Sequence, residues 1–366
     1  MKLECSLDKL KEAVGKAEKI TGKNSTLESL KSILFIASGK SLKIRSTNLS
    51  LGLEIEIPAK IEKEGEAIIA GDIINNTLFN LGSQDKVIVL ENTEGNLLLN
   101  NKKTKVLIKS LSSEDFPTIP VVEGKSFEIE IEKFMDGIKS VFYSAAVADI
   151  KPEISSVYIY NQEQDLFFVA TDSFRLAEKN LKIKNLKELD GLIIPYKNVT
   201  EIIKLLSDIK GEMKVFYNKN QVSFVLPGFY LTSRLIDGVF PDYRQIVPKG
   251  YKTRAIILKH DLMDAIRLSN IFSDKFNQIK VSVDPKAKKF EVYAINKDVG
   301  ENKTEIDGAL EGDPIEMSFN HKYILDCFQS ITEDSVVLEF SEANRPVVLR
   351  GNGDKSFLYL IMPMNR

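Results

Sequence analysis

The chain has 366 residues, with 50 Lys and Arg against 52 Asp and Glu, two His, two Cys and no Trp. This length fits two or three domains of ordinary size and is enough to bury a hydrophobic core. The net charge of −2 excludes a globally basic nucleic-acid-binding domain, so any contact with DNA must come from local basic patches.

Cysteine usage and hydropathy exclude further protein classes. Cys5 and Cys327 lie far apart in the sequence and neither has a second thiol near it, which excludes a disulfide framework and a zinc knuckle. Charged residues interrupt the N-terminal stretch, and no window approaches the roughly 18 apolar residues that a membrane span needs. We therefore expect a soluble cytoplasmic protein without a membrane segment, a metal or a cofactor.

The predicted elements, taken in chain order, repeat three times. Each copy opens with alternating residues followed by apolar positions at helical spacing, and these openings start at Leu3, Phe127 and Ala255. A second predicted helix recurs more strictly, with corresponding apolar positions 125 residues apart at Ile74, Val199 and Ile324. The period is too long for a solenoid, so each copy is expected to be a full domain.

The rest of each copy is predicted to be strands and turns. Alternation over residues 127–131 indicates a sheet with one exposed face, and the turn segments 217–220 and 351–354 favour antiparallel hairpins. The fold class is therefore α+β, with two helices per copy packed on antiparallel sheets. Phe-Pro pairs at 116–117 and 240–241 close the first two copies. They predict three domains, at residues 1–122, 123–250 and 251–366.

The predicted helices each have one apolar and one polar face. Ser6 is a plausible N-cap of the first helix, whose apolar face would hold Leu7, Leu10, Val14 and Ala17. On the second helix of the middle copy the apolar face is assigned to Val199, Ile202, Ile203 and Leu206, and Lys197 and Lys204 share the outward face. A single lysine pair fits an ordinary solvated helix face. The same layout repeated over six helices instead favours a shared surface that these lysines line.

Residues that could carry catalysis are few. His260 and His321 stand alone, and residues 351–356 lack the glycine spacing of a phosphate loop and fit a hairpin turn better. Asp172 and Arg175 flank a hydroxyl and could form either a local ion pair or a site. Since Asp172 has no general-base partner in the sequence, an enzyme interpretation is weak.

Several motifs, in this order and spacing, resemble those of a known family. They are Thr171-Asp172-Ser173-Phe174-Arg175-Leu176-Ala177, residues 237–244 (DGVFPDYR), residues 360–364 (LIMPM) and Asp115-Phe116-Pro117. Together with the threefold repeat they resemble the bacterial DNA sliding clamp, the beta subunit of DNA polymerase III. The resemblance covers the whole chain. It implies a non-enzymatic processivity factor, a head-to-tail homodimer whose six domains form a ring around duplex DNA, with helices lining the hole.

The resemblance also implies partners and a site for them. The family binds peptides with apolar anchors from the polymerase III catalytic subunit, the clamp loader and repair proteins, in a pocket between the second and third domains. The matching residues are Ile154, Thr171, Ser173, Phe174, Arg175, Leu176, Pro241, Ile246, Leu360, Met362, Pro363 and Met364. Arg175 could hydrogen-bond a peptide carbonyl there, and the methionines would supply an adaptable apolar floor.

This chain departs from the family pattern at two places in the pocket. Ser173-Phe174 stands where the family commonly has Gly-His, and the tail ends in Asn365-Arg366. Both changes bear on which peptides are preferred.

Further residues are assigned by the same resemblance. The ring joint matches Val106 and Ile108 on a strand of the first copy, with Ile271 and Phe272 of the third, as exposed apolar residues beside an edge strand. DNA-facing candidates are Lys23, Lys151, Lys197 and Lys204. The alternatives left open are an enzyme, or a peptide-binding scaffold that does not bind DNA, each using the cleft of Asp172 and Arg175.

Overall fold

The structure is a computed structural model that describes residues 1–22, 26–82, 86–93, 95–111, 116–148, 150–184, 186 and 188–364. Lys23, Asp115 and the Asn365-Arg366 tail therefore lie outside the described residues. The chain forms two compact units. The first contains Met1–Ile131 with Lys204–Leu235, and the second contains Glu132–Ile203 with Ile236–Arg366.

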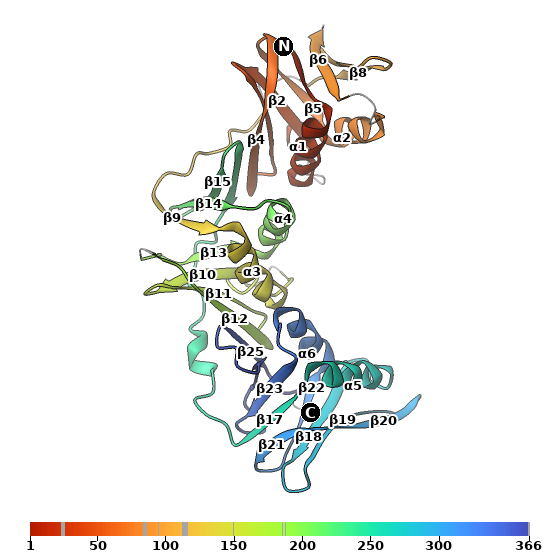
Figure 1. Ribbon diagram of the computed structural model, residues 1–366, viewed down its shortest axis with the longest axis vertical. Helices are drawn as coiled ribbons and strands as arrows, with labels where there is room; N and C mark the ends of the chain where they lie inside the picture. The colour runs from red at the N-terminus through yellow and green to blue at the C-terminus, as the bar shows by residue number, and fades with distance from the viewer. Residues whose placement is uncertain are drawn as a thin grey trace. The chain divides into compact units, whose positions relative to one another are not determined.

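The first unit contains helices on a long antiparallel sheet (Figure 1). Its elements are β1 (Lys2–Ser6), α1 (Leu7–Ile20), η1 (Glu28–Lys31), β2 (Ser32–Ser38), β3 (Ser41–Thr47), β4 (Leu51–Lys63), β5 (Gly65–Ala70), α2 (Gly71–Asn80), β6 (Val87–Thr93), β7 (Asn96–Asn100), β8 (Lys105–Lys109), β9 (Lys125–Glu130), β14 (Glu212–Tyr217), β15 (Gln221–Leu226) and β16 (Phe229–Arg234).

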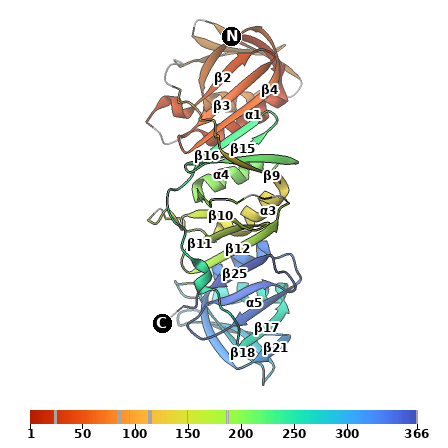
Figure 2. The same ribbon diagram turned by 90° about the vertical axis from the view of Figure 1, so that its left-hand side faces the viewer.

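One long strand holds this unit together. Over the described residues the sheet runs β8-β7-β6-β1-β4-β16-β15-β14-β9, with β2, β3 and β5 branching from it. Figure 2 shows β2, β3 and β4 side by side. Because β4 pairs with β16, part of the middle repeat joins the first unit, which explains why the two compact units do not follow the three predicted domains.

The second unit contains the remaining elements. They are α3 (Ile131–Val141), η3 (Phe142–Ser144), β10 (Ser156–Gln162), β11 (Asp165–Thr171), β12 (Arg175–Lys182), β13 (Leu192–Pro195), α4 (Tyr196–Leu206), η4 (Tyr243–Ile246), β17 (Thr253–Leu258), α5 (Lys259–Ile271), β18 (Gln278–Asp284), β19 (Lys289–Asn296), β20 (Gly300–Ile306), β21 (Gly308–Gly312), β22 (Ile315–Asn320), α6 (His321–Cys327), η5 (Phe328–Ser330), β23 (Ser335–Phe340), β24 (Val347–Gly351) and β25 (Phe357–Ile361). Both α3 and α4 reach slightly into the first unit.

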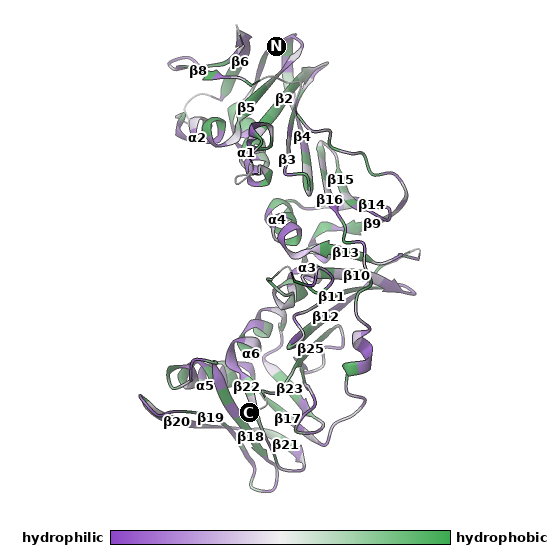
Figure 3. Cartoon of the chain, turned by 180° about the vertical axis from the view of Figure 1, so that it is seen from behind, coloured by the Kyte–Doolittle hydropathy of each residue, from purple (hydrophilic) through white to green (hydrophobic). Residues whose placement is uncertain are grey.

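Two antiparallel sheets form the framework of the second unit. Its larger sheet runs β13-β10-β11-β12-β25-β24-β23-β17-β21, and its smaller sheet runs β20-β19-β18-β22, counted over the residues described. Burial alternates along β17, and Figure 3 shows hydrophobic and hydrophilic residues interleaved along the strands. The pairing of β24 with β25 confirms a hairpin at residues 351–356 in place of a phosphate loop.

The helices confirm the predicted repeat and the α+β class. The second helices, α2, α4 and α6, begin at Gly71, Tyr196 and His321, which are 125 residues apart. Their apolar positions Ile74, Val199 and Ile324 are all buried. The apolar faces form because residues three or four apart in a helix lie on the same side and pack on the sheet.

Individual helix faces agree with the sequence, with one exception. Leu7, Leu10, Val14 and Ala17 of α1 are fully buried. At the N-terminus of α1, Ser6 Oγ accepts a hydrogen bond from the backbone N–H of Lys9 at 3.4 Å. In α4, Leu205 is buried and Ile203 is half-buried, so the buried stripe there is one position broader than the sequence indicated.

Both cysteines are buried and unpaired. Among the helices that the structure describes, none is long and apolar enough to cross a membrane.

Candidate functional site

A tight turn between β11 and β12 carries the first group of predicted site residues. Thr171 Oγ1 donates to the Arg175 carbonyl at 2.7 Å and accepts from the Ser173 N–H at 3.1 Å. Asp172 Oδ1 accepts from the N–H groups of Phe174 and Arg175, each at 2.9 Å. Ser173 has φ 76°, a left-handed conformation that favours Gly and strains other residues. The turn leaves the Phe174 side chain 60% exposed.

Arg175 is held by acceptors from three separate parts of the second unit. Its Nε–H donates to Asp172 Oδ2 at 3.0 Å, and its remaining nitrogens donate to Asp326 of α6 and to the Tyr143 carbonyl. The guanidinium carbon lies 4.6 Å from the centre of the Tyr323 ring. The ion pair expected between Asp172 and Arg175 is therefore present, and both Asp172 oxygens already accept hydrogen bonds.

The C-terminal segment docks against this turn. Residues Arg175 and Leu176 of β12 pair with Ile361 and Leu360 of β25. Beyond β25, the Met362 N–H donates to the Phe174 carbonyl at 2.8 Å, so the turn and the tail are joined. The Met364 N–H donates to the Ser318 carbonyl of β22 at 2.8 Å. Pro363 and Met364 line a hollow of about 540 Å³ together with Lys280 and Glu316.

The segment around η4 covers the other side of the same strands. Phe240 and Tyr243 pack into a buried cluster that includes Leu176 and Leu360. In contrast, Pro241 is exposed and Ile246 is 47% exposed. Ile246 lines a hollow of about 420 Å³ with Tyr251 and Arg345, among others. The η4 segment thus supplies both buried and exposed residues next to the predicted peptide pocket.

A hydrogen-bond network fixes η4 to the sheet. The Tyr243 hydroxyl bonds to Glu178 of β12 and lies 2.6 Å from the Tyr160 hydroxyl, which also accepts from Arg244 at 2.8 Å. Burial raises the pKa of the Glu178 carboxyl. It also raises the pKa of the Tyr243 hydroxyl, with the Glu178 charge adding to the effect. The network is suited to hold the segment in place, because its polar groups are satisfied within it.

The structure brings together most of the predicted pocket residues. Leu176 and Leu360 share one buried cluster, Thr171 is buried and pairs with Leu176, and the turn and the tail are joined through Phe174 and Met362. Pro241 and Ile246 are exposed on the η4 segment, and their place in the pocket stays a prediction. Ile154 is half-buried and its backbone bonds to Ala146 and Lys151. No contact described above places it with the rest, so its membership stays a prediction.

Sequence reasoning missed the residues that support the site. Tyr143, Glu178, Tyr323 and Asp326 all contact predicted site residues or their neighbours. Tyr243, which bonds to Glu178, belongs to the DGVFPDYR motif and so carried a signal in the sequence. The others make contacts far along the chain, which local spacing does not reveal.

The predicted ring-joint residues lie on or near the last strands of two sheets, counted over the described part of the chain. The strand β8 ends the sheet of the first unit, and Val106 there is half-buried while Ile108 is 7% exposed. The expectation that both are exposed is therefore wrong. Side chains alternate across a strand, so Leu107 points outward instead and is 63% exposed.

The second edge belongs to the smaller sheet of the second unit. Its edge strand is β20, and the ring of Phe272 lies next to Gly300 at the start of that strand. Ile271 is 66% exposed and Phe272 is half-buried. Phe272 thus lies against β20, which is the last strand of its sheet over the described residues, and Ile271 precedes it at the end of α5.

The predicted DNA-facing lysines are on the surface where the structure describes them. Lys197 and Lys204 are exposed on α4, and Lys151 is exposed in the loop between η3 and β10. Lys23 lies outside the described residues. Lys197 and Lys204 are seven residues apart and therefore share one side of α4.

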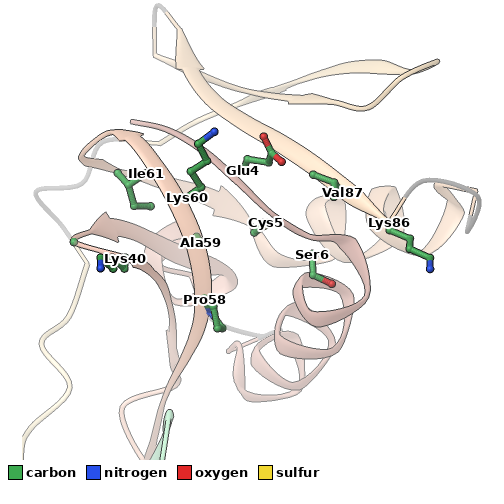
Figure 4. A pocket seen from close by; sticks show the side chains of 11 residues that line it. Glu4, Cys5, Ser6, Lys40, Pro58, Ala59, Lys60, Ile61, Lys86 and Val87 are labelled. Carbon is green, nitrogen blue, oxygen red and sulfur yellow. The ribbon is translucent and has the colours of Figure 1, made fainter.

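A further hollow of about 830 Å³ lies in the first unit, where β4 leaves β3 and pairs with β1 (Figure 4). Lys40, Lys60 and Lys86 line it, and Cys5 contributes to its floor. Burial raises the pKa of the Cys5 thiol to about 12, so this sulfur is protonated and unreactive at neutral pH. None of the predicted site residues lies here.

Comparison with known proteins decides the family. Models of the N-terminal, central and C-terminal domains of the DNA polymerase III beta subunit match residues 1–120, 128–242 and 244–365. The chain belongs to this family. It is therefore a sliding clamp by descent, and the function of such a clamp is DNA polymerase processivity.

Individual relatives match nearly the whole chain. The beta sliding clamp of Rickettsia bellii is 25% identical, with 97% of each chain covered, and that of Staphylococcus aureus is 26% identical, with 93% of each covered. The solved Bacillus subtilis sliding clamp superposes with a TM-score of 0.95 at 23% identity, covering 100% of this chain and 99% of that one. A Pseudomonas aeruginosa sliding clamp, solved bound to griselimycin, superposes with a TM-score of 0.95 at 23% identity, covering 100% of both chains.

Proposed function

We propose that two copies of this chain close head to tail into a ring around duplex DNA. The ring slides freely and tethers the polymerase III catalytic subunit, the clamp loader and repair proteins through one apolar pocket per subunit. The chain itself performs no catalytic step, and the clamp loader hydrolyses ATP. The protein acts on DNA in the cytoplasm.

The observation that carries the proposal is a pair of strands with complementary charge, each the last of its sheet among the residues that the structure describes. The outward face of β8 holds Lys105, Leu107 and Lys109, all exposed. The outward face of β20 holds Glu301, Lys303 and Glu305, all exposed, and Lys303 is paired with Glu291 of β19 at 2.9 Å, which leaves the two glutamates as the charges in excess. An edge strand offers unpaired backbone groups, and lysines opposite glutamates favour pairing of β8 with β20 over pairing of β8 with itself.

Apolar residues next to each edge support the same joint. On the first unit, Leu107 is exposed beside the buried Ile108. On the second unit, Val299 directly precedes β20 and Ile271 ends α5, and both are exposed. Because isolated edges with such residues promote aggregation, their burial between two subunits is the arrangement that keeps the protein in solution.

Weak phosphate contact fits a protein that must slide. Each tight contact between a lysine and a phosphate adds salt-dependent affinity and would hold the clamp in place. A chain with 50 basic and 52 acidic residues avoids such affinity overall. Lys151, Lys197 and Lys204 would offset the repulsion of DNA locally, along with Lys23.

The ring is tested by its dependence on DNA topology. Static light scattering is expected to give twice 41.2 kDa. After loading, the protein is expected to stay on nicked circular DNA and to leave when the circle is cut once by a restriction enzyme. Equal retention on circular and linear DNA would mean ordinary affinity and would refute the ring, as would a monomer at micromolar concentration.

The peptide pocket is tested by shortening its methionines. Met362→Ala with Met364→Ala is expected to weaken binding of a labelled peptide from the polymerase III catalytic subunit by about 2 kcal/mol, because apolar anchors at a pocket centre dominate such affinities. Fluorescence anisotropy measures the change, and griselimycin serves as a second probe. Retention on circular DNA is the control and stays at the wild-type level. Unchanged peptide affinity would remove the pocket assignment.

The competing interpretations use the cleft of Asp172 and Arg175. An enzyme would need Asp172 as a base, yet its two oxygens accept hydrogen bonds from three donors of the chain. A nucleotide- or metal-dependent turnover that Asp172→Asn abolishes would favour the enzyme. A peptide-binding scaffold without DNA would fail the circular-DNA assay while keeping its peptide affinity.

A further inference from the structure

The turn that carries Arg175 has a counterpart in the first repeat, and the pair forms an internal comparison. Between β3 and β4, Thr47 Oγ1 donates to the Leu51 carbonyl at 2.7 Å, and Asn48 Oδ1 accepts from the N–H groups of Ser50 and Leu51. Leu49 has φ 71°, matching the 76° of Ser173. The Arg234 N–H donates to the Ser50 carbonyl at 2.8 Å, as Met362 does to Phe174. The two turns share one backbone design.

The charges of the second turn are absent from the first. Asn48 stands where Asp172 is, and the buried Leu51 stands where Arg175 is. Since the first copy forms the same turn without them, neither the ion pair nor the arginine is needed to fold it. The Arg175 side chain is only 11% exposed, and burying a cation in place of a leucine costs free energy unless it is fully paired. The arginine therefore serves a purpose other than the turn.

The partners of Arg175 indicate that purpose. Asp326 belongs to α6 and is 151 residues away in the sequence. Tyr323, on the same helix, places its ring against the guanidinium. The Tyr359 hydroxyl of β25 donates to the Tyr323 carbonyl at 2.8 Å, which fixes that helix to the strand leading into the tail. Arg175 is thus where α6 meets the peptide pocket.

These contacts form a closed circuit around the predicted pocket. Asp326 holds Arg175, whose neighbour Phe174 accepts from Met362. Two residues on, Met364 is bound to Ser318 of β22, the strand that leads into α6. A break at Asp326 would release Arg175 and leave both the turn and the tail free to shift. Apolar anchors depend on such preorganisation for their affinity.

We propose that Asp326 is a positioning residue of the peptide pocket, which fixes Arg175 against α6 and so sets the distance between the Phe174 turn and the Met362–Met364 tail. This inference rests on the proposed peptide binding. It also assigns Arg175 chiefly to the pocket frame, since three of its five N–H donors are already used within the chain.

The test is a double-mutant cycle on the full-length dimer with the labelled polymerase III peptide. Asp326→Asn is expected to weaken peptide binding about tenfold, a loss in the range of one charge-assisted hydrogen bond. Arg175→Leu, the residue that the first repeat uses, weakens it as well. In the Arg175→Leu background, Asp326→Asn causes no further loss, because its partner is gone.

The control is Asp264→Asn on α5, which makes the same change of charge at an exposed residue paired with Arg267. It leaves peptide affinity unchanged. Calorimetry of each variant measures folding separately. The inference would be overturned if Asp326→Asn lowered the melting temperature but bound the peptide normally. It would also be overturned if the losses of peptide affinity from Asp326→Asn and Arg175→Leu multiplied in the double variant.

A second variant and a measurement on the wild type separate the possible outcomes. If Asp326→Asn fails to fold, Asp326→Glu carries the test: it keeps the carboxylate but moves it, so a smaller loss of affinity is expected and unchanged affinity overturns the inference. Failure of the wild-type protein to bind the peptide would instead refute the proposed function itself.

Discussion

His321 begins α6 and is one of two histidines in the chain. It is 2% exposed, and neither ring nitrogen has a hydrogen-bond partner among the described residues. Burial lowers the pKa of its imidazole from the ordinary value of 6.5, and Lys322 lowers it further while Asp326 opposes this. The folded state therefore favours the neutral imidazole of His321, as expected for a buried group without a counterion.

This shift predicts a loss of stability in acid. A histidine whose folded pKa is depressed contributes stability above pH 6.5, and that contribution is lost as the pH falls through the folded pKa. Replacing His321 by Leu is expected to flatten the pH dependence between 7.5 and 5 and to stabilise the protein by about 1 kcal/mol at neutral pH, since an unpaired buried polar group is removed. Urea unfolding at several pH values measures both effects.

His260→Gln is the matched control for this prediction. His260 is exposed, so its replacement removes a histidine without removing a buried polar group. A His321→Leu profile that follows the wild-type slope would show that other groups cause the acid sensitivity.

At the scale of elements, the strands β8 and β20 are the most consequential parts of the fold. Each is the last strand of its sheet, counted over the described residues. Lys105 and Lys109 lie on the outward face of β8. Glu301, Lys303 and Glu305 lie on that of β20, where Lys303 is paired with Glu291. Glu305 also lies 3.9 Å from Lys289, a long surface pair that competes weakly for its charge.

This pattern predicts a charge-swap rescue. Lys105→Glu with Lys109→Glu is expected to dissociate the dimer, since like charges then face each other in the joint. Adding Glu301→Lys and Glu305→Lys to the same chain is expected to restore it. Analytical ultracentrifugation at low salt measures the dissociation constant, which rises at least tenfold in the first variant.

Mixing provides the control for this swap. The chain with Lys105→Glu and Lys109→Glu and the chain with Glu301→Lys and Glu305→Lys, here called the half-swapped chains, are each expected to be monomeric alone. When mixed they are expected to form a dimer, because both joints of that dimer pair lysines with glutamates. Dimers that persist in either half-swapped chain alone would contradict pairing of β8 with β20.

At the scale of the whole molecule, the proposed function depends on closure more than on affinity. The chain is slightly acidic, and its helices carry scattered lysines instead of a dense basic surface. A protein that bound DNA by charge would lose affinity steeply with salt, by roughly one power of salt concentration per phosphate contact. Topological retention has no such dependence as long as the ring stays closed.

The lysines therefore separate the two modes of binding. Changing Lys151, Lys197 and Lys204 to Gln is expected to leave retention on nicked circles at the wild-type level, because the ring still encloses the DNA. Weak binding to linear DNA at low salt falls severalfold, since three charges are removed. Filter binding and gel filtration on DNA measure the two quantities. Loss of retention on circles in proportion to loss on linear DNA would argue against topology.

The sequence alone determined the repeat, the fold class and the faces of the helices. The spacing of 125 residues between Ile74, Val199 and Ile324 reappears in the helix starts, and the apolar face of α1 is buried as its periodicity requires. These features follow from local rules, because a helix or strand places side chains at a fixed period along the chain. The candidate pocket did not follow from these rules: it was assigned from the resemblance to the sliding-clamp family, through short contiguous motifs, and its residues stay a prediction.

Only the tertiary structure decided which residues meet across long distances and which way a strand faces. Asp326 reaches Arg175 over 151 residues, and Glu178 meets Tyr243 over 65, neither of which any local pattern signals. A shift of one residue turns a strand over, so Ile108 is buried and Leu107 is exposed, the reverse of the expectation for Ile108. Register and partner choice are set by the pairing of whole sheets, and that pairing exists only once the chain has folded.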